Sequence, residues 1–266
     1  MRIAFRASLL LLAALVAAGT ARAAEEDCPV PEAAEAVVLA GADRHGDLLL
    51  ADGRVLALAG LAPRQDAAER DRFTSGLTGH RGKRFRLAVL GAPDRWGRLP
   101  ARLVPPEREG EAAQDLAVAL LAAGAAQHLP EPGQPGCNRL WREAAARAHA
   151  PVAGAATGRE EKPLAFAVVD GHDPAAMRRH AGRIVTVEGR IATVAERTRR
   201  TYLNFERRRG AGGSLILQSV LWRELQRDGW TASGLAGKRV RARGVVEGRD
   251  GLLVAIHARG ALEMID

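Results

Sequence analysis

The sequence is poor in several informative residue types, and these shortages narrow what the chain can do. Of its 266 residues, two are cysteine, one is tyrosine and three are lysine, so arginine supplies most of the basic side chains. The seven histidines are scattered, and no His-x-x-His, Cys-x-x-Cys or His-Glu-x-x-His spacing occurs, which argues against a zinc site. Neither a glycine-rich phosphate loop after a strand-like run nor a Gly-x-Ser-x-Gly elbow is present.

Long hydrophobic runs are missing as well. Ala7–Ala18 is apolar and uncharged, but it falls short of the roughly 20 residues that a membrane-spanning helix needs. Arg2 and Arg6 lie before this run, and Ala21–Ala23 (Ala-Arg-Ala) provides the small-x-small pattern of a signal peptidase site. We predict that residues 1–23 are a cleaved signal peptide and that the mature protein is periplasmic or secreted, without a membrane span. A retained N-terminal anchor is the alternative.

The two cysteines, Cys28 and Cys137, are predicted to form one disulfide, because exported proteins with an even cysteine count usually pair them. The bond would tie the mature N-terminus to the far end of the front half. Closing such a long loop stabilises a fold by about 4–5 kcal/mol in the chain-entropy model. Two free thiols are the alternative.

Charge divides unevenly along the chain. Residues 24–162 hold 18 Lys and Arg against 20 Asp and Glu, whereas residues 163–266 hold 18 against 11. The excess of arginine over lysine is typical of the coding bias of a GC-rich bacterial genome. Arginine content alone therefore says little about whether the protein binds nucleic acid. The positive field of the back half nevertheless favours a polyanionic partner: nucleic acid, anionic lipid or an acidic protein.

Hydrophobic periodicity predicts two β-rich domains. In the front half, strand-like runs cover 37–39, 48–50, 55–58, 84–90 and 100–104, and helical spacing covers 66–77, 112–123 and 138–148. In the back half, strand-like runs cover 166–169, 184–194, 201–205, 214–217, 238–247 and 252–257, and helical spacing covers 173–180 and 220–228. We predict a mainly β fold with helices (α+β): two small five-stranded OB-type barrels in tandem. Their predicted bounds are residues 24–150 and 164–266, with a linker at 151–163.

Four stretches of the front half, in this order, carry a resemblance to a known family: His45–Leu48, Val55–Pro63, Asp94–Leu99 and Leu116–His128. The first stands where that family has an Asp-Gly-Asp-Thr turn, and the second is similar to its Val-Arg-Leu-Ala-Gly-Ile-Asp-Ala-Pro-Glu segment. The third, with Trp96 in place of the usual tyrosine, matches an Asp-Arg-Tyr-Gly-Arg-Leu loop. From about residue 36 to 148 the chain thus resembles the staphylococcal (thermonuclease-like) nuclease family.

The resemblance implies a site for phosphodiester hydrolysis, of which this sequence keeps two elements. In the family, one calcium ion and two arginines stabilise a phosphodiester under attack by water. Asp47 matches the first carboxylate ligand of the metal, and Arg98 matches the second phosphate-binding arginine. These two residues are the candidate catalytic remnants, and Asp47 is the candidate metal ligand.

The other matching positions lack the functional groups that the family has there. Ala57 stands where the first arginine belongs, Ala62 where the second metal-binding aspartate belongs, and Arg64 or Gln65 near the general-base glutamate. Loss of the base alone costs about 10²–10⁴-fold in rate. We therefore expect a degenerate, inactive site and no cofactor. Three nearby acids are open as substitutes, although each is also explained as a solvated surface acid: Asp43, Asp66 and Glu69.

The back half resembles the OB-type domains found behind such nuclease-like modules in some bacterial proteins. Its candidate nucleic-acid-binding residues combine one aromatic ring with cations: Tyr202, Arg200, Arg207, Arg241 and Arg243. Strand parity places Tyr202 and Phe205 on opposite faces, so only one of them is available for stacking and the other is expected in the core. A solvated basic hairpin and a solvated outer strand face are the alternatives for the arginines.

Three functions remain open on the sequence. The first is an exported, catalytically inactive nuclease-like protein whose barrels bind single-stranded nucleic acid, another polyanion or an envelope protein partner. The second is a calcium-dependent phosphodiesterase or endonuclease with a rewired site that uses Asp47, Arg98 and a further acid. The third is a structural envelope protein that recognises neither nucleic acid nor metal.

Overall fold

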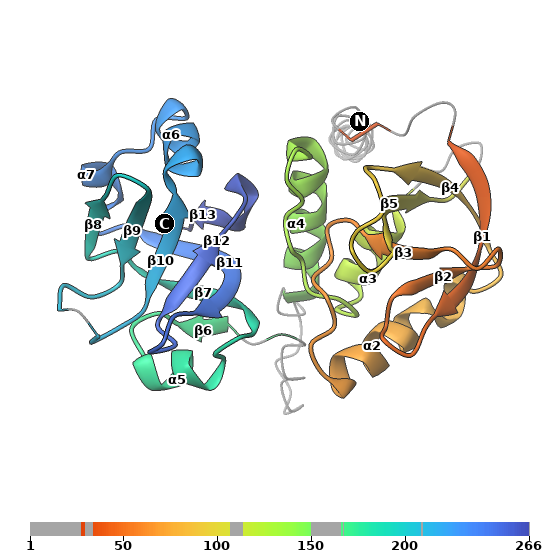
Figure 1. Ribbon diagram of the computed structural model, residues 1–266, viewed down its shortest axis with the longest axis horizontal. Helices are drawn as coiled ribbons and strands as arrows, with labels where there is room; N and C mark the ends of the chain where they lie inside the picture. The colour runs from red at the N-terminus through yellow and green to blue at the C-terminus, as the bar shows by residue number, and fades with distance from the viewer. Residues whose placement is uncertain are drawn as a thin grey trace, which may run out of the picture.

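The computed structural model describes residues 28–29, 34–106, 114–149, 166, 168–208 and 210–265. The predicted signal peptide and the predicted linker lie outside these ranges. Within them, no helix has both the length and the apolar character that crossing a membrane requires. Figure 1 shows two bodies, each built round its own sheet, with helix α4 (Pro135–His149) between them.

Five strands of the front half close into a barrel. They are β1 (Glu35–Ala42), β2 (Leu48–Leu50), β3 (Val55–Leu58), β4 (Arg84–Val89) and β5 (Leu99–Val104). The order round the barrel is β1-β2-β3-β5-β4, and β3 and β5 run parallel. β1 closes the ring because its first half pairs with β4 and its second half with β2, with a register shift between Leu39 and Gly41. This confirms the five-stranded barrel predicted for the front half.

The barrel core consists of alternate apolar residues of these strands, as a period of two requires. Leu48 and Leu50 of β2 are buried, for example, whereas the residue between them is partly exposed. Helix α2 (Ala67–Leu77) joins β3 to the short helix η1 (Thr78–His80) that leads into β4. Asp66 begins α2 as its N-cap, because its side chain accepts the N–H of Glu69, and Phe73 anchors the helix in the core.

Helix α3 (Leu116–Ala122) and α4 pack against one another at the end of the barrel. Trp141 of α4 is fully buried, and its indole ring lies directly over Gly60. A Cβ atom at Gly60 would come within 2.4 Å of that ring, and the φ angle of Gly60 is +81°. Both the close approach and the backbone conformation therefore require glycine at this position.

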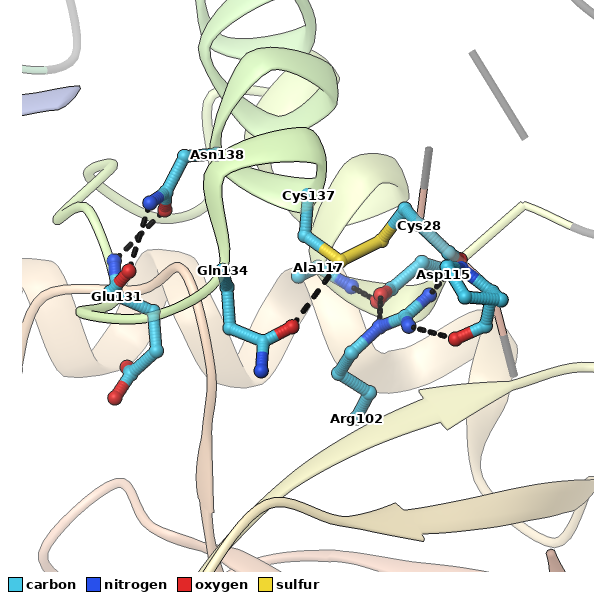
Figure 2. The surroundings of a disulfide bond; sticks show 9 residues. Cys28, Arg102, Asp115, Ala117, Glu131, Gln134, Cys137 and Asn138 are labelled. Atoms are coloured by element: carbon cyan, nitrogen blue, oxygen red, sulfur yellow. Dashed lines mark hydrogen bonds and ion pairs between the residues drawn. A yellow bond between two sulfur atoms is a disulfide. The ribbon is translucent and has the colours of Figure 1, made fainter. Parts of the chain in front are cut away.

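The predicted disulfide between Cys28 and Cys137 is present, and it brings the segment before β1 onto α4 (Figure 2). The same segment completes a buried polar cluster. Nε of Arg102 pairs with the Asp115 carboxylate at 2.9 Å, and its two other nitrogens donate to the carbonyl oxygens of Pro29 and Cys28 at 2.9 and 3.2 Å. The disulfide thus holds in place two acceptors that a buried guanidinium needs.

The back half forms an eight-stranded sheet. Its strands are β6 (Val168–Asp170), β7 (Ile184–Arg190), β8 (Thr193–Glu196), β9 (Arg200–Asn204), β10 (Ser214–Gln218), β11 (Arg239–Glu247), β12 (Leu253–Ile256) and β13 (Leu262–Met264). The order is β6-β7-β11-β12-β10-β9-β8, and β13 adds to β11. β6 pairs with β7 and β10 with β12 in parallel. The second closed barrel stays a prediction.

Short helices join these strands. They are α5 (Pro174–Arg179), α6 (Ser219–Arg227), α7 (Ala232–Leu235) and η2 (Arg259–Ala261). α5 starts as predicted, with Pro174 at its first position and the Asp173 side chain accepting two backbone N–H groups. α7 and β13 were not predicted, because an element of three or four residues is too short to show a repeating pattern by itself.

The two bodies meet through polar contacts. The Gln65 side-chain amide pairs with the backbone of Ile184, accepting its N–H at 2.5 Å and donating to its carbonyl oxygen at 3.0 Å. Arg183 pairs with Asp66 at 2.5 Å. A second contact lies where α4 meets η2, and there Arg142 lies 3.7 Å from Glu263 of β13.

Candidate functional site

Two turns at the barrel rim share one conformation. Residues 43–47 join β1 to β2, and residues 94–98 lead into β5. In each turn the first aspartate accepts the backbone N–H groups two and four residues later, at 2.8 to 3.0 Å. Gly46 and Gly97 occupy the matching positions with φ angles of +83° and +78°. The pattern Asp-Arg-x-Gly therefore builds both turns, and each presents its fifth residue at a fixed place.

Those fifth residues, Asp47 and Arg98, meet across the rim. Nη1 of Arg98 donates to both carboxylate oxygens of Asp47, at 3.1 and 3.3 Å. Nη2 of Arg64 contacts the same carboxylate at 3.3 Å. The Asp47 side chain is 13% exposed and the Arg64 side chain 8%. The structure thus brings the two sequence-predicted remnants together and adds Arg64, which the sequence placed only near the lost general base.

Two guanidiniums and two carboxylates balance one another at this site, because Nη2 of Arg98 also pairs with Asp94 at 2.8 Å. Burial lowers the pKa of Arg64, and the neighbouring carboxylate of Asp47 counters that effect. Burial also opposes the charge of Arg98, but the hydrogen bond to Asp94 and the charge of Asp47 outweigh it and raise its pKa. The Arg64 guanidinium lies 4.4 Å above the Phe73 ring, which adds a cation–π contact. Asp47 thus contacts two guanidiniums, and one of them, that of Arg98, also contacts the carboxylate of Asp94.

The donors at Asp47 do not fit a calcium ion. Calcium takes about six to eight oxygen ligands, and the single carboxylate here lies between two positive groups. Within the described residues, no three His, Cys, Asp or Glu side chains are grouped to hold a metal ion. The proposed role of Asp47 as a metal ligand is untested, and we derive no catalytic step through a metal.

The three acids considered as substitutes have other partners. The Asp43 carboxylate accepts two backbone N–H groups of its own turn. Asp66 caps α2 and pairs with Arg183. Glu69 accepts the N–H of Gln65 at 2.7 Å and lies 3.5 Å from Arg183. All three carboxylates therefore serve the local fold or the contact between the two bodies.

The outward face of the back sheet is the second candidate site. On β9, Leu203 and the following Phe205 are fully buried, whereas Tyr202 points the other way and is partly exposed. This confirms that Tyr202 and Phe205 lie on opposite faces and that Phe205 belongs to the core. Arg200 lies two residues before Tyr202 on the same face, and it is exposed.

Exposed arginines surround this face. Figure 1 shows β8 and β9 on the side of the back body that lies away from α4. The loops at the two ends of β9 contribute Arg197, Arg199, Arg207 and Arg208, all exposed. Of the acids nearby, Glu206 accepts a hydrogen bond from Nδ1 of His172 at 2.7 Å. The charge of this face is positive because its exposed arginines outnumber Glu196 and Glu206.

Arg241 and Arg243 belong to a different part of the sheet. Arg241 pairs with Glu188 at 2.6 Å, and Arg243, which is 8% exposed, pairs with Glu263 at 3.1 Å. Both lie where β11 pairs with β7 and β13, beside the contact with α4. The structure does not bring them together with Tyr202, and their predicted role in binding nucleic acid stays untested.

Trp96, which stands in place of the usual tyrosine of the loop that carries the resemblance, is a further functional candidate. Its ring is 63% exposed at the tip of the second turn, 3.9 Å from the guanidinium carbon of Arg95 and 4.9 Å from that of Arg98. The pattern Asp-Arg-Trp-Gly-Arg was the available signal, because the flanking arginines and the glycine place the ring at a turn tip.

Comparison with known proteins adds little. No protein-family model matches the chain, and no curated protein matches it. A solved structure titled "OBody AM1L10 bound to hen egg-white lysozyme" is similar with 19% identity and a TM-score of 0.26. That match covers 36% of this chain and 92% of the other. A score this low carries no argument, and the resemblance to the nuclease family stays a prediction.

Proposed function

We propose that this chain binds single-stranded nucleic acid through the outward face of β9 and β10, and that it does not cleave the strand. One observation carries the proposal: a partly exposed tyrosine, Tyr202, lies between exposed arginines on a sheet face that otherwise presents polar side chains beside the nearly buried Ile216. An aromatic platform with cations on either side is what a base and its two phosphates require.

The expected binding energies distinguish a binding face from a solvated basic hairpin. Stacking of one base on an aromatic side chain is worth about 1–3 kcal/mol. Each arginine that neutralises a phosphate releases counterions, so affinity falls steeply as salt rises. A solvated hairpin would bind polyanions weakly and without any contribution from Tyr202.

The pairing order of the back sheet supports the proposal of a second OB-type barrel. Starting from β8, the order is β8-β9-β10-β12-β11-β7, and β7 and β8 are separated only by residues 191–192. Taken as one bent strand, β7 and β8 would pair at both ends of this series, as β1 does in the front barrel. β9 and β10 would then be the second and third strands, the face on which such barrels bind oligonucleotides.

The front site supports binding without hydrolysis. Arg64 and Arg98 both contact the Asp47 carboxylate, so the acid that the resemblance assigns to a metal is neutralised within the protein. Export to the periplasm or beyond is part of the same proposal. The Cys28–Cys137 disulfide supports it, since such bonds persist in oxidising compartments.

Titration of fluorescently labelled oligonucleotides, followed by anisotropy at several salt concentrations, tests the proposal. Tyr202→Ala should weaken binding about tenfold or more, because the stacking energy is lost. Tyr202→Phe keeps the ring and should bind like the wild type. Arg200→Ala should weaken binding and reduce its salt dependence, whereas Arg84→Ala, an exposed arginine of the front barrel, should do neither.

Two results would overturn the proposal. The first is an affinity that Tyr202→Ala leaves unchanged. The second is cleavage of the strand in calcium that Arg98→Ala abolishes, which would establish the rewired phosphodiesterase instead.

A further inference from the structure

The outward face of the back sheet contains a small hollow beside Tyr202. Its floor is formed by Ile216 of β10 and Ala255 of β12, which are only 5% and 4% exposed although their side chains point outward. Four long polar or charged side chains form the walls: Arg200, Gln218, Glu247 and His257. Ile256, the last residue of β12, completes the lining.

Strand register places this hollow next to the tyrosine. Tyr202 lies opposite Ile216, and Ile216 lies opposite Ala255, so the three residues form one row across β9, β10 and β12. Neighbouring strands are about 4.8 Å apart, and the row therefore spans about 10 Å. A planar ring system that overlaps Tyr202 at one end reaches over the apolar floor at the other.

The walls combine opposite hydrogen-bonding characters. The Glu247 carboxylate only accepts hydrogen bonds, the Arg200 guanidinium only donates them, and the Gln218 amide does both. Neither Arg200 nor Glu247 has an ion-pair partner among the described residues, so both groups are available to a ligand.

We propose that a guanine base of the bound strand lies flat over this hollow, whose own volume is only about 30 Å³, an inference that rests on the proposed function. Guanine carries two adjacent donors, N1–H and the N2 amino group, which match the two oxygens of the Glu247 carboxylate. It also carries two adjacent acceptors, O6 and N7, which match the fork of Arg200. Adenine, cytosine and thymine lack one or other of these adjacent pairs. Tyr202 supplies the stacking surface and the hollow supplies the selectivity.

Analogue bases test the proposal atom by atom. The probe is a thymidine oligonucleotide of about 15 nucleotides, near the upper end of what one such fold covers, with one central base varied. One guanine should raise affinity about tenfold over thymine, since a bidentate pair discriminates by about 1–3 kcal/mol. Inosine, which lacks the N2 amino group, and 7-deazaguanine, which lacks N7, should each lose most of that gain.

Protein variants assign the contacts. Glu247→Gln should abolish the preference for guanine while binding to the thymidine strand persists. Glu196→Gln, which removes the same charge from the exposed end of β8, corrects for the general effect of charge and should keep the preference. Guanine preference that survives Glu247→Gln overturns the inference, as does equal or stronger binding of adenine or cytosine.

Binding of a strand and selectivity for guanine are tested by different outcomes. If no strand binds at any salt concentration, the proposed function fails. If strands bind through Tyr202 with equal affinity for every base, the proposed function stands and only the guanine site is wrong.

Discussion

At the scale of single residues, Asp47 stands at a position that the resemblance assigns to a metal ligand, and the structure places it in ion pairs. The resemblance to nucleases identified Asp47 and Arg98, and the structure places Nη1 of Arg98 3.1 Å from Oδ1 of Asp47. The sequence did not reveal that Arg64 completes the group, because its approach depends on how the segment after β3 turns back over Phe73. The acid that the resemblance assigns to a metal is here the counter-ion of two arginines.

Asp47→Asn should therefore destabilise the front barrel. The change removes a carboxylate that is 13% exposed and leaves the buried Arg64 without its partner, which should cost about 2–3 kcal/mol, below the 3–5 kcal/mol of a fully buried pair. Urea unfolding measures it. Asp52→Asn, which breaks an exposed pair with Arg54, is the control and should change little. Equal effects of the two substitutions would contradict this account of Asp47.

At the scale of elements, strands were the most predictable part of the molecule. Alternation in 84–89 and 239–247 follows directly from a sheet with one buried face, and both strands are present. The same alternation could not predict which residues the outward arginines pair with. Arg241 and Arg243 look like a binding strand in the sequence, yet their partners Glu188 and Glu263 are far away in the chain. Such pairings depend on strand order, which local patterns do not contain.

The disulfide that holds the segment before β1 should contribute to the stability of the barrel. Reducing the Cys28–Cys137 bond, or replacing both cysteines with serine, should destabilise the barrel by about 4–5 kcal/mol from chain entropy. Detachment of residues 28–29 would also take two acceptors from Arg102. Thermal unfolding with and without reductant measures the effect. A change below about 2 kcal/mol, the lower end of typical disulfide effects, would show that the segment stays docked without the bond.

At the scale of the whole molecule, the two bodies are joined through the segment that a nuclease would use for its base. Gln65, near the position of the family's general-base glutamate, pairs with both backbone groups of Ile184. An amide can accept and donate at once, whereas a carboxylate can only accept. The docking of the back sheet therefore uses an amide at the position where the resemblance places an acid.

Gln65→Glu should loosen the two bodies rather than restore hydrolysis. A carboxylate facing the carbonyl oxygen of Ile184 should cost about 1–3 kcal/mol, the penalty of an unsatisfied polar group. Small-angle scattering should report a larger radius of gyration, and Gln226→Glu on the exposed face of α6 serves as the control. An unchanged scattering curve together with calcium-dependent cleavage would contradict the link.

Acid should also lower the free energy of unfolding. His128 is 2% exposed, and burial, with Arg243 and Arg142 nearby, lowers its pKa to about 3. The unfolded chain binds a proton near pH 6.5 and the folded chain does not, so stability should fall as pH drops from 6.5 toward 3. His128→Leu should flatten that part of the stability profile. An identical pH profile in the variant would exclude His128 as the cause.

Photo-cross-linking tests the central claim most directly. A single-stranded oligonucleotide containing 5-bromouracil is irradiated with the full chain in calcium, and the cross-linked peptide and the length of the strand are determined by mass spectrometry. We expect an intact strand joined to the β9 peptide at Tyr202. Cross-links confined to the front barrel at Trp96, or a shortened strand, would contradict the account.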